Sequence, residues 1–369
     1  MSKILNVIYT NTYGGGETLL QTIFKCAIFD RDNIIFLVIG SVNGEFQSNL
    51  ESMGYTVYWQ KAPAIEFSRG WNYYFLSFCF VLFGLFRFTI LHFNILRKCK
   101  IIHSHEPRCF LALIPYCAIT GTKIIFHAHG FSSLTRSIFI RFGAFFPNSV
   151  TLISVSNKLQ ETLGFSKCTH LFRFVLPNCI DLSEWKPIKV NRHDAKVFLN
   201  VGRWIDVKRQ SEIIDCFLKV KEQFSEIKLK ILTDKVPPIF CGLEEKGVFF
   251  VCGANKNAVK KEYYEADFFV FFSDEREGFA IVLLEAMASG LPIISSHVGL
   301  MEEIDYGLKI EVNDKNGLTS AMTNCLNNPA FCQRLASQSE TIVSEYDCGN
   351  IAKKLKGIYN FIEKKGKQY

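Results

Sequence analysis

The chain has 369 residues, of which 49% are apolar, and it carries a formal net charge of +7. This length allows two ordinary domains, and the moderate charge excludes the strongly basic surface of a typical nucleic-acid-binding protein. The 13 cysteines show no repeated spacing and no C-x-x-C pair, which excludes a disulfide framework and favours reduced thiols in a cytoplasmic protein. The start, MSKILNVIYTN, lacks the apolar core of a signal peptide and predicts a strand.

Short β-branched or apolar runs alternate with longer helical patterns along the chain. Strands separated by helix-length segments predict parallel sheets built from βαβ units, and two such series predict two doubly wound α/β domains. The first series of predicted strands comprises Ile4–Tyr9, Ile34–Ile39, Thr56–Trp59, Ile101–His103, Lys123–His127 and Leu152–Val155. The second comprises Val197–Val201, Lys228–Leu232, Val248–Val251, Phe268–Phe272 and Pro292–Ser296.

A domain boundary is predicted within Leu176–Lys189, because proline, asparagine and aspartate interrupt this segment and it has no hydrophobic period. We therefore divide the chain into residues 1–180, residues 181–348 and a basic amphipathic C-terminal helix at 349–369, which can return to the first domain. This helix has Leu355, Ile358, Tyr359 and Ile362 at helical spacing.

The segment Trp71–Leu96 is unusually aromatic and allows three interpretations. The favoured one is a buried helix of the first domain. A membrane span is less favoured, because the uncharged run Tyr73–Phe86 is shorter than a spanning helix needs and would cut the first βαβ series in two. The third is a helix whose aromatic face enters a bilayer interface, with Ser137–Phe146 as its companion.

The residues from Asp267 to Glu303 carry the clearest chemistry. The predicted strand leads through a polar loop, Ser273–Gly278, into a predicted helix at Ala280–Ser289 that ends at Gly290. Open α/β sheets bind ligands at such strand ends. The unpaired amides of the first helical turn can bind phosphate oxygens, and the helix dipole adds to the attraction. These amides belong to Ala280, Ile281 and Val282.

Two carboxylates, Glu277 and Glu285, flank this helix terminus. A carboxylate next to a phosphate site is repelled by the phosphate, so these groups are better suited to accept hydrogen bonds from hydroxyls. A sugar nucleotide offers hydroxyls on both sides of its diphosphate. The alternative is that Glu285 is a solvated surface charge, which its apolar neighbours in the sequence disfavour.

The run SDEREGFAIVLLEAMASGLPIISS resembles the E-x7-E motif of glycosyltransferase family 4, a retaining GT-B family also called glycosyl transferases group 1. Ala280 stands where the family usually has glycine. The following VGLMEEI resembles the family's G-G-x-x-E, with Leu300 in place of the second glycine. The resemblance implies that Glu285 holds the ribose and Glu277 the transferred sugar. It further implies donor contacts from Gly278, Phe279, Ala280, Ile281, Val282, Gly299 and Glu303.

The segment NVGRWIDVKRQ places Arg203 and Lys208 directly after a predicted strand. Two cations at this spacing can clamp a diphosphate, although most Arg and Lys residues are plain surface charges. The segment resembles the family's G-R-x-x-x-x-K, which implies that both residues stabilise the departing nucleoside diphosphate. Arg209 replaces a common glycine of the family, a difference that we expect to have little effect.

In the first domain, the glycine-rich turn NTYGGGETLL follows the first strand. Glycines let a backbone approach a ligand closely, although a plain tight turn explains them equally well. The turn is similar to a G-G-x-E loop of the family, which makes Gly15 and Gly16 candidates for donor binding.

Four histidines alternate on two predicted strands, in IIHSHEP and IIFHAHGF. Each pair would share one face of its strand. Four histidines could suggest zinc, but no carboxylate or cysteine accompanies them at a firm ligand spacing, so zinc is disfavoured. His129 resembles the family histidine that contacts the transferred sugar, and the resemblance implies a structural role for His103 and His105.

A D-x-D sequence at Asp30–Asp32 has the form of the metal-binding motif of the other large glycosyltransferase fold. It lies at the amino end of a predicted strand, where ligands do not normally bind, so we interpret it as a loop.

The resemblance implies a GT-B fold, with two Rossmann-like domains facing across a cleft, the acceptor on the first and the donor on the second. It implies glycosyl transfer with retention, without an enzymic nucleophile, metal or other cofactor. The implied partners are a nucleotide-sugar donor and a lipid-linked oligosaccharide acceptor at the inner face of the cytoplasmic membrane, as in O-antigen-type surface polysaccharide synthesis. Two alternatives are a GT-B sugar-nucleotide epimerase and a non-catalytic sugar-nucleotide-binding or membrane-scaffold protein.

Overall fold

The chain divides into two compact units, Met1–Asn178 with Cys348–Tyr369 and Cys179–Asp347. The division falls close to the predicted boundary between residues 180 and 181. The computed structural model describes residues 2–10, 15–40, 44–62, 70–130, 149–165, 171–185 and 196–365; in the helix that starts at residue 70, the side chains of 70–78, 80 and 81 are not described.

The first unit contains a seven-stranded sheet in the order β3-β2-β1-β4-β5-β6-β7, and all of its pairings are parallel. All six predicted strands of the first series are present. The edge strand β7 was not predicted, because its four residues are partly exposed and include Arg173. The strands are β1 (Lys3–Thr10), β2 (Ile34–Gly40), β3 (Thr56–Lys61), β4 (Cys99–Ser104), β5 (Lys123–Ala128), β6 (Val150–Ser154) and β7 (Phe172–Val175).

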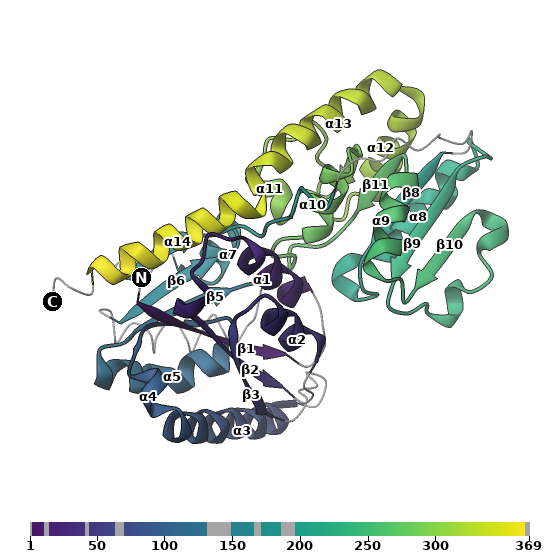
Figure 1. The fold of residues 1–369 in the computed structure, drawn as a ribbon. Coiled ribbons are helices and arrows are strands. Elements are labelled where there is room, and N and C mark those ends of the chain that lie inside the picture. Colours follow the sequence, from purple (N-terminus) through teal and green to yellow (C-terminus); the bar gives the residue numbers. More distant parts are fainter. Residues whose placement is uncertain are drawn as a thin grey trace. The chain divides into compact units, whose positions relative to one another are not determined.

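The helices of this unit connect and cover its strands (Figure 1). The interior strand β2 is buried along its whole length, as expected for a parallel sheet covered on both faces. The helices are α1 (Gly15–Lys25), α2 (Glu45–Ser52), α3 (Gly70–Leu91), α4 (Phe93–Leu96), α5 (Pro107–Thr120), α7 (Asn157–Thr162) and α14 (Cys348–Lys365).

Helix α14 comes from the far end of the chain and packs against α1 and β4 in the first unit (Figure 1). Its buried residues include Ile351, Leu355, Ile358 and Ile362, which repeat at helical spacing and form one apolar face. The ammonium group of Lys356 donates to the carbonyl oxygen of Ile28 at 2.7 Å.

Helix α3 corrects the prediction of a buried helix. Its C-terminal half buries Leu85 and Phe88, but Phe83 and Phe86 are 66% and 65% exposed. The physical reason is that α3 contacts the edge strand β3 and helix α5, and a helix in that place buries one side only, whereas this sequence is apolar all round. Within the part of the chain that the structure describes, no helix is long and apolar enough to span a membrane. The segment Ser137–Phe146 lies outside the described residues.

The second unit contains a five-stranded parallel sheet in the order β10-β9-β8-β11-β12, and all five predicted strands are present. The chain runs outward from β8 to β10, then returns to β11 on the other side of β8. The strands are β8 (Val197–Val201), β9 (Lys228–Thr233), β10 (Val248–Cys252), β11 (Phe268–Phe271) and β12 (Ile293–Ser295). The helices are α8 (Gln210–Lys221), α9 (Lys256–Glu265), α10 (Ile281–Ala288), α11 (Leu300–Glu303), α12 (Lys315–Asn327) and α13 (Pro329–Val343).

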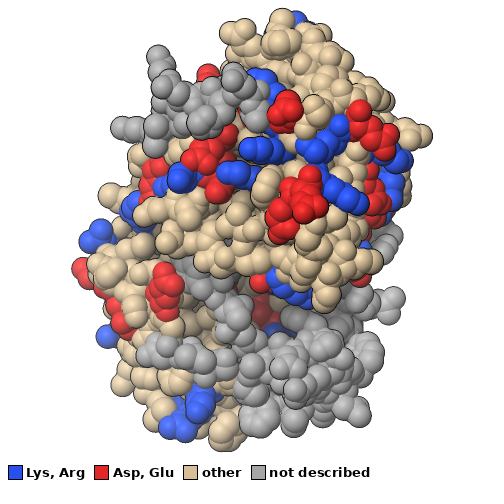
Figure 2. Space-filling view, turned by 90° about the vertical axis from the view of Figure 1, so that its right-hand side faces the viewer, with Lys and Arg blue, Asp and Glu red and all other residues tan. Residues whose placement is uncertain are grey.

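The charges on the face drawn in Figure 2 are of both signs, with Lys and Arg interspersed among Asp and Glu. Ion pairs account for some of the charges in the second unit, including Lys230 with Glu262 at 2.6 Å and Lys260 with Glu184 at 3.4 Å. Partly exposed ion pairs of this kind add little to the stability of the fold. They do place positive and negative side chains next to one another.

Candidate active site

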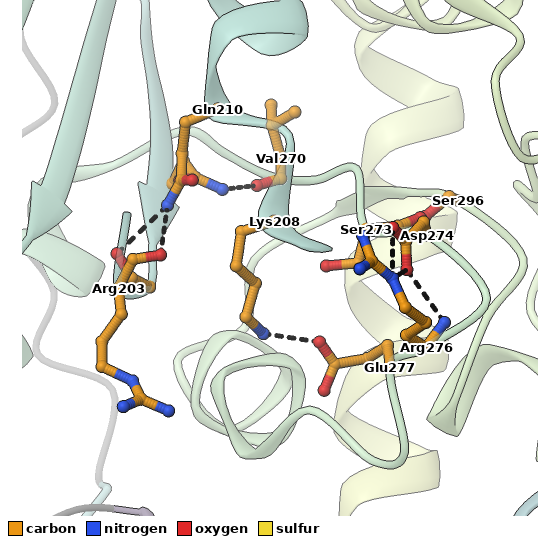
Figure 3. Close-up of polar contacts among 11 residues, drawn as sticks. Arg203, Lys208, Gln210, Val270, Ser273, Asp274, Arg276, Glu277 and Ser296 are labelled. Carbon is orange, nitrogen blue, oxygen red and sulfur yellow. Dashed lines mark hydrogen bonds and ion pairs between the residues drawn. The ribbon is translucent and has the colours of Figure 1, made fainter. Parts of the chain in front are cut away.

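The candidate site lies where the chain order of the second sheet reverses, between β8 and β11. Ligands of open α/β sheets bind at such switch points, beyond the carboxyl ends of the strands. Backbone and side-chain hydrogen bonds join the loops here. The Asp274 amide donates to the Val207 carbonyl at 3.0 Å. Ser296 Oγ donates to the Ser273 carbonyl at 2.8 Å (Figure 3). The loops after β8, β11 and β12 therefore form one connected edge.

Lys208 and Glu277 form an ion pair in the middle of this edge (Figure 3). Lys208 Nζ lies 2.6 Å from Glu277 Oε2, and the two side chains are only 17% and 12% exposed. The ammonium also lies over the ring of Phe271, 4.7 Å from its centroid. Both residues were predicted as site residues, but their direct contact was not. A partly dehydrated cation is thus held at the switch point by a carboxylate.

Arg203 follows β8, is exposed, and extends from its loop to the same side as Lys208 in Figure 3. Gln210 holds this loop: its Nε2 donates to the carbonyls of Gly202 and Arg203 at 3.1 and 3.0 Å. Asn200 Nδ2 donates to the Val270 carbonyl at 2.8 Å and ties β8 to β11. The sequence did not identify Gln210, because the burial of its side chain against this loop is evident only in the fold.

A second pair, Asp274 and Arg276, was also missed. Arg276 Nε donates to both carboxylate oxygens of Asp274, at 3.1 and 3.0 Å. Burial acts to raise the pKa of Asp274, but the hydrogen bonds and charge of Arg276 outweigh it and hold that pKa below its ordinary value. The pair braces the loop that carries Glu277.

Glu285 lies on α10 and is held by a tyrosine. Tyr263, which is fully buried, donates its hydroxyl proton to Glu285 Oε2 at 2.9 Å. Burial raises the pKa of the Glu285 carboxyl, while the Tyr263 hydrogen bond and the charges of Lys256 and Lys260 act in the opposite direction. Glu285 is therefore a positioned acceptor and not a solvated surface charge.

The N-terminus of α10 has no side-chain cap, and its N-cap residue is Ala280. Phe279 and Ala280 are buried beside it, 6% and 3% exposed. The φ angle of Ala280 is −83°, which any L-residue adopts, so alanine fits where the family usually has glycine. The amides of Ile281 and Val282 belong to the first turn, whose N–H groups can receive an anion.

Two backbone positions near this terminus have positive φ. Gly299 has φ of 58°, and a Cβ added there would lie 3.4 Å from Glu277 Cγ, so the loop that leads to α11 and Glu303 packs directly on the Glu277 loop. Arg209 also has left-handed backbone, with φ of 46°. A non-glycine residue there costs about 1–2 kcal/mol. Arg209 thus strains the backbone at a position where glycine would not. The expectation that this replacement has little effect on the site stays a prediction.

In the first unit, Gly15 and Gly16 begin α1, and residues 11–14 lie outside the described residues. Gly16 is exposed, and a Cβ added there would meet no atom within 4 Å, so packing does not require glycine. The D-x-D sequence forms a short 3₁₀ helix and not the predicted loop: Asp30 caps Arg31–Asn33 and accepts from the Asp32 amide at 3.2 Å, at the amino end of β2.

His129 follows β5 and lies in a cluster with the other three histidines. Its Nε2 is 3.0 Å from Nδ1 of His105. Burial lowers the pKa of His129 to about 4, so the ring is neutral at pH 7. The predicted contact of His129 with the transferred sugar stays a prediction.

Comparison with known proteins agrees with this geometry. Residues 195–328 match the family model described as glycosyl transferases group 1. The chain is 25% identical over 237 residues to N-acetyl-alpha-D-glucosaminyl L-malate synthase of Bacillus anthracis, covering 56% of this chain and 60% of the relative. It is 24% identical over 289 residues to phosphatidyl-myo-inositol mannosyltransferase of Mycobacterium leprae, covering 72% and 74%. The first alignment thus spans less than two thirds of the relative's length.

Solved structures resemble the whole chain. Anabaena Alr3699/HepE in complex with UDP and glucose has a TM-score of 0.74 at 18% identity, covering 98% of this chain and 100% of that one. Sucrose-phosphate synthase of Thermosynechococcus elongatus has a TM-score of 0.75 at 15% identity, covering 98% and 99%. The fold is GT-B, as predicted. Residues 195–328 are thus similar to glycosyl transferases group 1, and both relatives named above are similar to this chain over part of their length.

Proposed function

We propose that this enzyme transfers a sugar from a nucleoside-diphosphate sugar to a saccharide acceptor, with retention at the anomeric carbon. The observation that supports this most is the convergence of Lys208, the uncapped α10 terminus and Glu285 on one sheet edge. Uridine diphosphate is the first candidate nucleotide, because Alr3699/HepE has been solved with UDP and with UDP-glucose.

In this proposal the diphosphate lies at the N-terminus of α10, where the first-turn amides and the helix dipole favour an anion. Lys208 contacts it from the other side, and the exposed Arg203 adds a second cation. As the glycosidic C–O bond breaks, negative charge grows on the diphosphate, and these groups stabilise it. We propose that this electrostatic stabilisation requires no metal ion at the diphosphate.

The remaining site residues hold the two sugars of the donor. The Glu285 carboxylate accepts from the ribose hydroxyls, and Glu277 accepts from hydroxyls of the transferred sugar. His129 contacts the same sugar, and Gly15 and Gly16 bind it through the backbone. The acceptor hydroxyl attacks the anomeric carbon from the side of the leaving group, and a leaving phosphate oxygen takes its proton, so no enzymic nucleophile takes part.

A donor panel tests this proposal. Purified protein is mixed with UDP-, GDP-, dTDP- and CMP-linked sugars and a lipid-linked saccharide mixture, and the free nucleotide and glycosylated product are measured. We expect one donor class to release its nucleotide in step with acceptor glycosylation. Isomerised donor without nucleotide release would instead identify an epimerase, and complete inertness with every donor would refute the proposed transfer.

We further propose that the acceptor is lipid-linked, as in O-antigen-type synthesis, and that the enzyme binds the inner face of the cytoplasmic membrane. The support is the exposed apolar face of α3, which combines aromatic and aliphatic side chains with the exposed basic residue Arg87. Such a face inserts into the headgroup region and favours anionic lipid. The exposed apolar residues of this face are Leu82, Phe83, Phe86, Ile90 and Leu91.

Vesicle flotation tests the membrane proposal. We expect the chain to float with vesicles that contain phosphatidylglycerol and much less with pure phosphatidylcholine. The double variant Phe83→Ser/Phe86→Ser removes two large apolar groups and lowers the bound fraction about tenfold or more. Ile239→Ser, a matched change at an 81% exposed residue of the second unit, leaves flotation unchanged. Equal flotation of both variants would contradict the role of α3.

A further inference from the structure

Four histidines gather at the switch point of the first sheet, where the chain order reverses between β1 and β4. His103 and His127 are buried on neighbouring strands, and His105 and His129 follow the same strands and are partly exposed. The rings of His103 and His105 lie 4.1 Å apart between centroids, as do those of His127 and His129. One nitrogen each of His103, His105 and His127 lies within 4.8 Å of the others.

His103 Nδ1 lies 2.7 Å from the hydroxyl oxygen of Tyr359, on α14, and that hydroxyl also lies 3.5 Å from Asn6 Oδ1. In the tautomer in which the imidazole donates from Nδ1 to Tyr359, its Nε2 presents a bare lone pair. A metal-bound histidine is commonly held in this way, with its second nitrogen donating to an outer partner.

The cluster contains several imidazole nitrogens that the described residues leave without a hydrogen-bond partner. Among these residues, His103 Nε2, both nitrogens of His127 and Nδ1 of His129 are buried and have no hydrogen-bond partner. Unsatisfied buried polar atoms are costly.

We propose that His103, His105 and His127 bind a divalent transition-metal ion of the Zn²⁺ type, at a site in the first unit that is separate from the diphosphate site in the second. Zn–N bonds of about 2.0–2.1 Å place tetrahedral ligands roughly 3.3 Å apart, so modest ring rotations bring the three nitrogens together. Three imidazoles suit Zn²⁺ and its neighbours in the first transition row. In the sequence analysis, zinc was disfavoured because no carboxylate or cysteine accompanies the histidines. In the fold, the adjacent strands β4 and β5 bring three imidazoles together, so neither residue type is needed.

The outer contacts support this ligand set. His105 frees Nε2 by leaving its 3.3 Å contact with Asn6, and its Nδ1 then donates to His129 Nε2 at 3.0 Å. His103 donates to Tyr359. Both ligands thus use Nε2, with an outer hydrogen bond on Nδ1. The partly exposed His105 and His129 lie at the end of the cluster through which an ion can enter. Through Tyr359, the bound ion would fasten helix α14 to the first sheet.

Metal binding to the purified full-length chain tests the proposal, without any donor or acceptor. The protein is stripped with a chelator, then titrated with Zn²⁺ by calorimetry and with Co²⁺ by visible absorption. We expect one ion per chain, the visible bands of four-coordinate Co²⁺, and a higher Tm with Zn²⁺ than without. His127→Leu removes a ligand and abolishes all three signals, whereas His297→Leu, a histidine of the second unit, leaves them unchanged.

A second variant keeps the test valid if His127→Leu does not fold. Tyr359→Phe retains the ring but removes the outer contact of His103, and it should weaken Zn²⁺ binding about 10- to 100-fold. Tyr55→Phe is the matched control, because its buried hydroxyl donates to the Phe24 carbonyl at 2.6 Å and not to a histidine. Absence of stoichiometric binding by the wild-type chain, or equal affinities of Tyr359→Phe and Tyr55→Phe, would overturn the proposed site.

Discussion

We expect the Lys208→Ala variant to lose about 10²–10³-fold in kcat, the typical effect of removing one preorganised group that stabilises charge in a transition state. Lys208 is already held by Glu277 at 2.6 Å and by the Phe271 ring, so little reorganisation would precede its proposed contact with the diphosphate. Removing it also leaves the Glu277 carboxylate without its cation, next to an anionic leaving group. The measurement is the initial rate of nucleotide release at saturating donor.

Lys261→Ala is the control for this variant. Lys261 is on α9 in the same unit, its side chain is 73% exposed, and it makes only a 3.5 Å surface pair with Glu265. Its removal should leave kcat and the unfolding transition unchanged. If Lys208→Ala raised KM but kept kcat, Lys208 would bind the donor equally in the ground and transition states, and its assignment to the leaving group would be wrong.

The second large effect is expected for Glu285→Gln. The amide keeps the size of the side chain and can still accept from Tyr263, but it loses the charge that strengthens hydrogen bonds from ribose hydroxyls. Hydrogen bonds to charged groups contribute about 1.5–3 kcal/mol, so affinity for the nucleotide should fall roughly 10- to 100-fold. Calorimetric titration with the nucleoside diphosphate measures this, and Glu262→Gln, which alters the pair with Lys230, is the control.

The same residue makes a prediction about pH. Burial raises the pKa of the Glu285 carboxyl, so its ionised form, the one proposed to bind the ribose, is lost at a higher pH than for an ordinary glutamate. Nucleotide affinity of the wild-type chain should therefore weaken as the pH falls through this raised pKa. Glu285→Gln has no such titration, and its affinity should show a flatter pH dependence. Parallel pH profiles of the two proteins would contradict the ribose contact.

Much of the fold could be predicted because parallel strands buried on both faces read as continuous apolar runs. Phe268–Phe271 and Ile34–Gly40 are such runs, and both were found. The edge strand Phe172–Val175 could not be recognised, because edge residues are only partly buried and carry no such run. The exposure of α3 also depends on which strand this helix covers. Its uniformly apolar sequence does not show that α3 packs against the edge strand β3.

Within the site, residues such as Lys208 and Glu277 could be predicted from the sequence, but not which side chains contact one another. Lys208 and Glu277 are separated by 69 positions, and only the adjacency of β8 and β11 brings them into contact. Gln210 donates to backbone carbonyls, and Arg276 donates to the carboxylate of Asp274. A sequence motif does not identify such partners. The left-handed backbone at Arg209 explains why glycine is common there, and the resemblance alone gave no physical reason.

The return of α14 to the first unit affects the order in which the protein can be completed during synthesis. The second unit, Cys179–Asp347, is continuous in sequence and has all its residues before α14 has been made. The first unit waits for residues 348–365, although most of its sheet is synthesised first. During that interval the apolar surface that α14 later covers beside α1 is open to water and to other chains, as in other incompletely assembled domains. A truncation before α14 would make this transient state permanent in the first unit, while leaving the second unit's own chain intact.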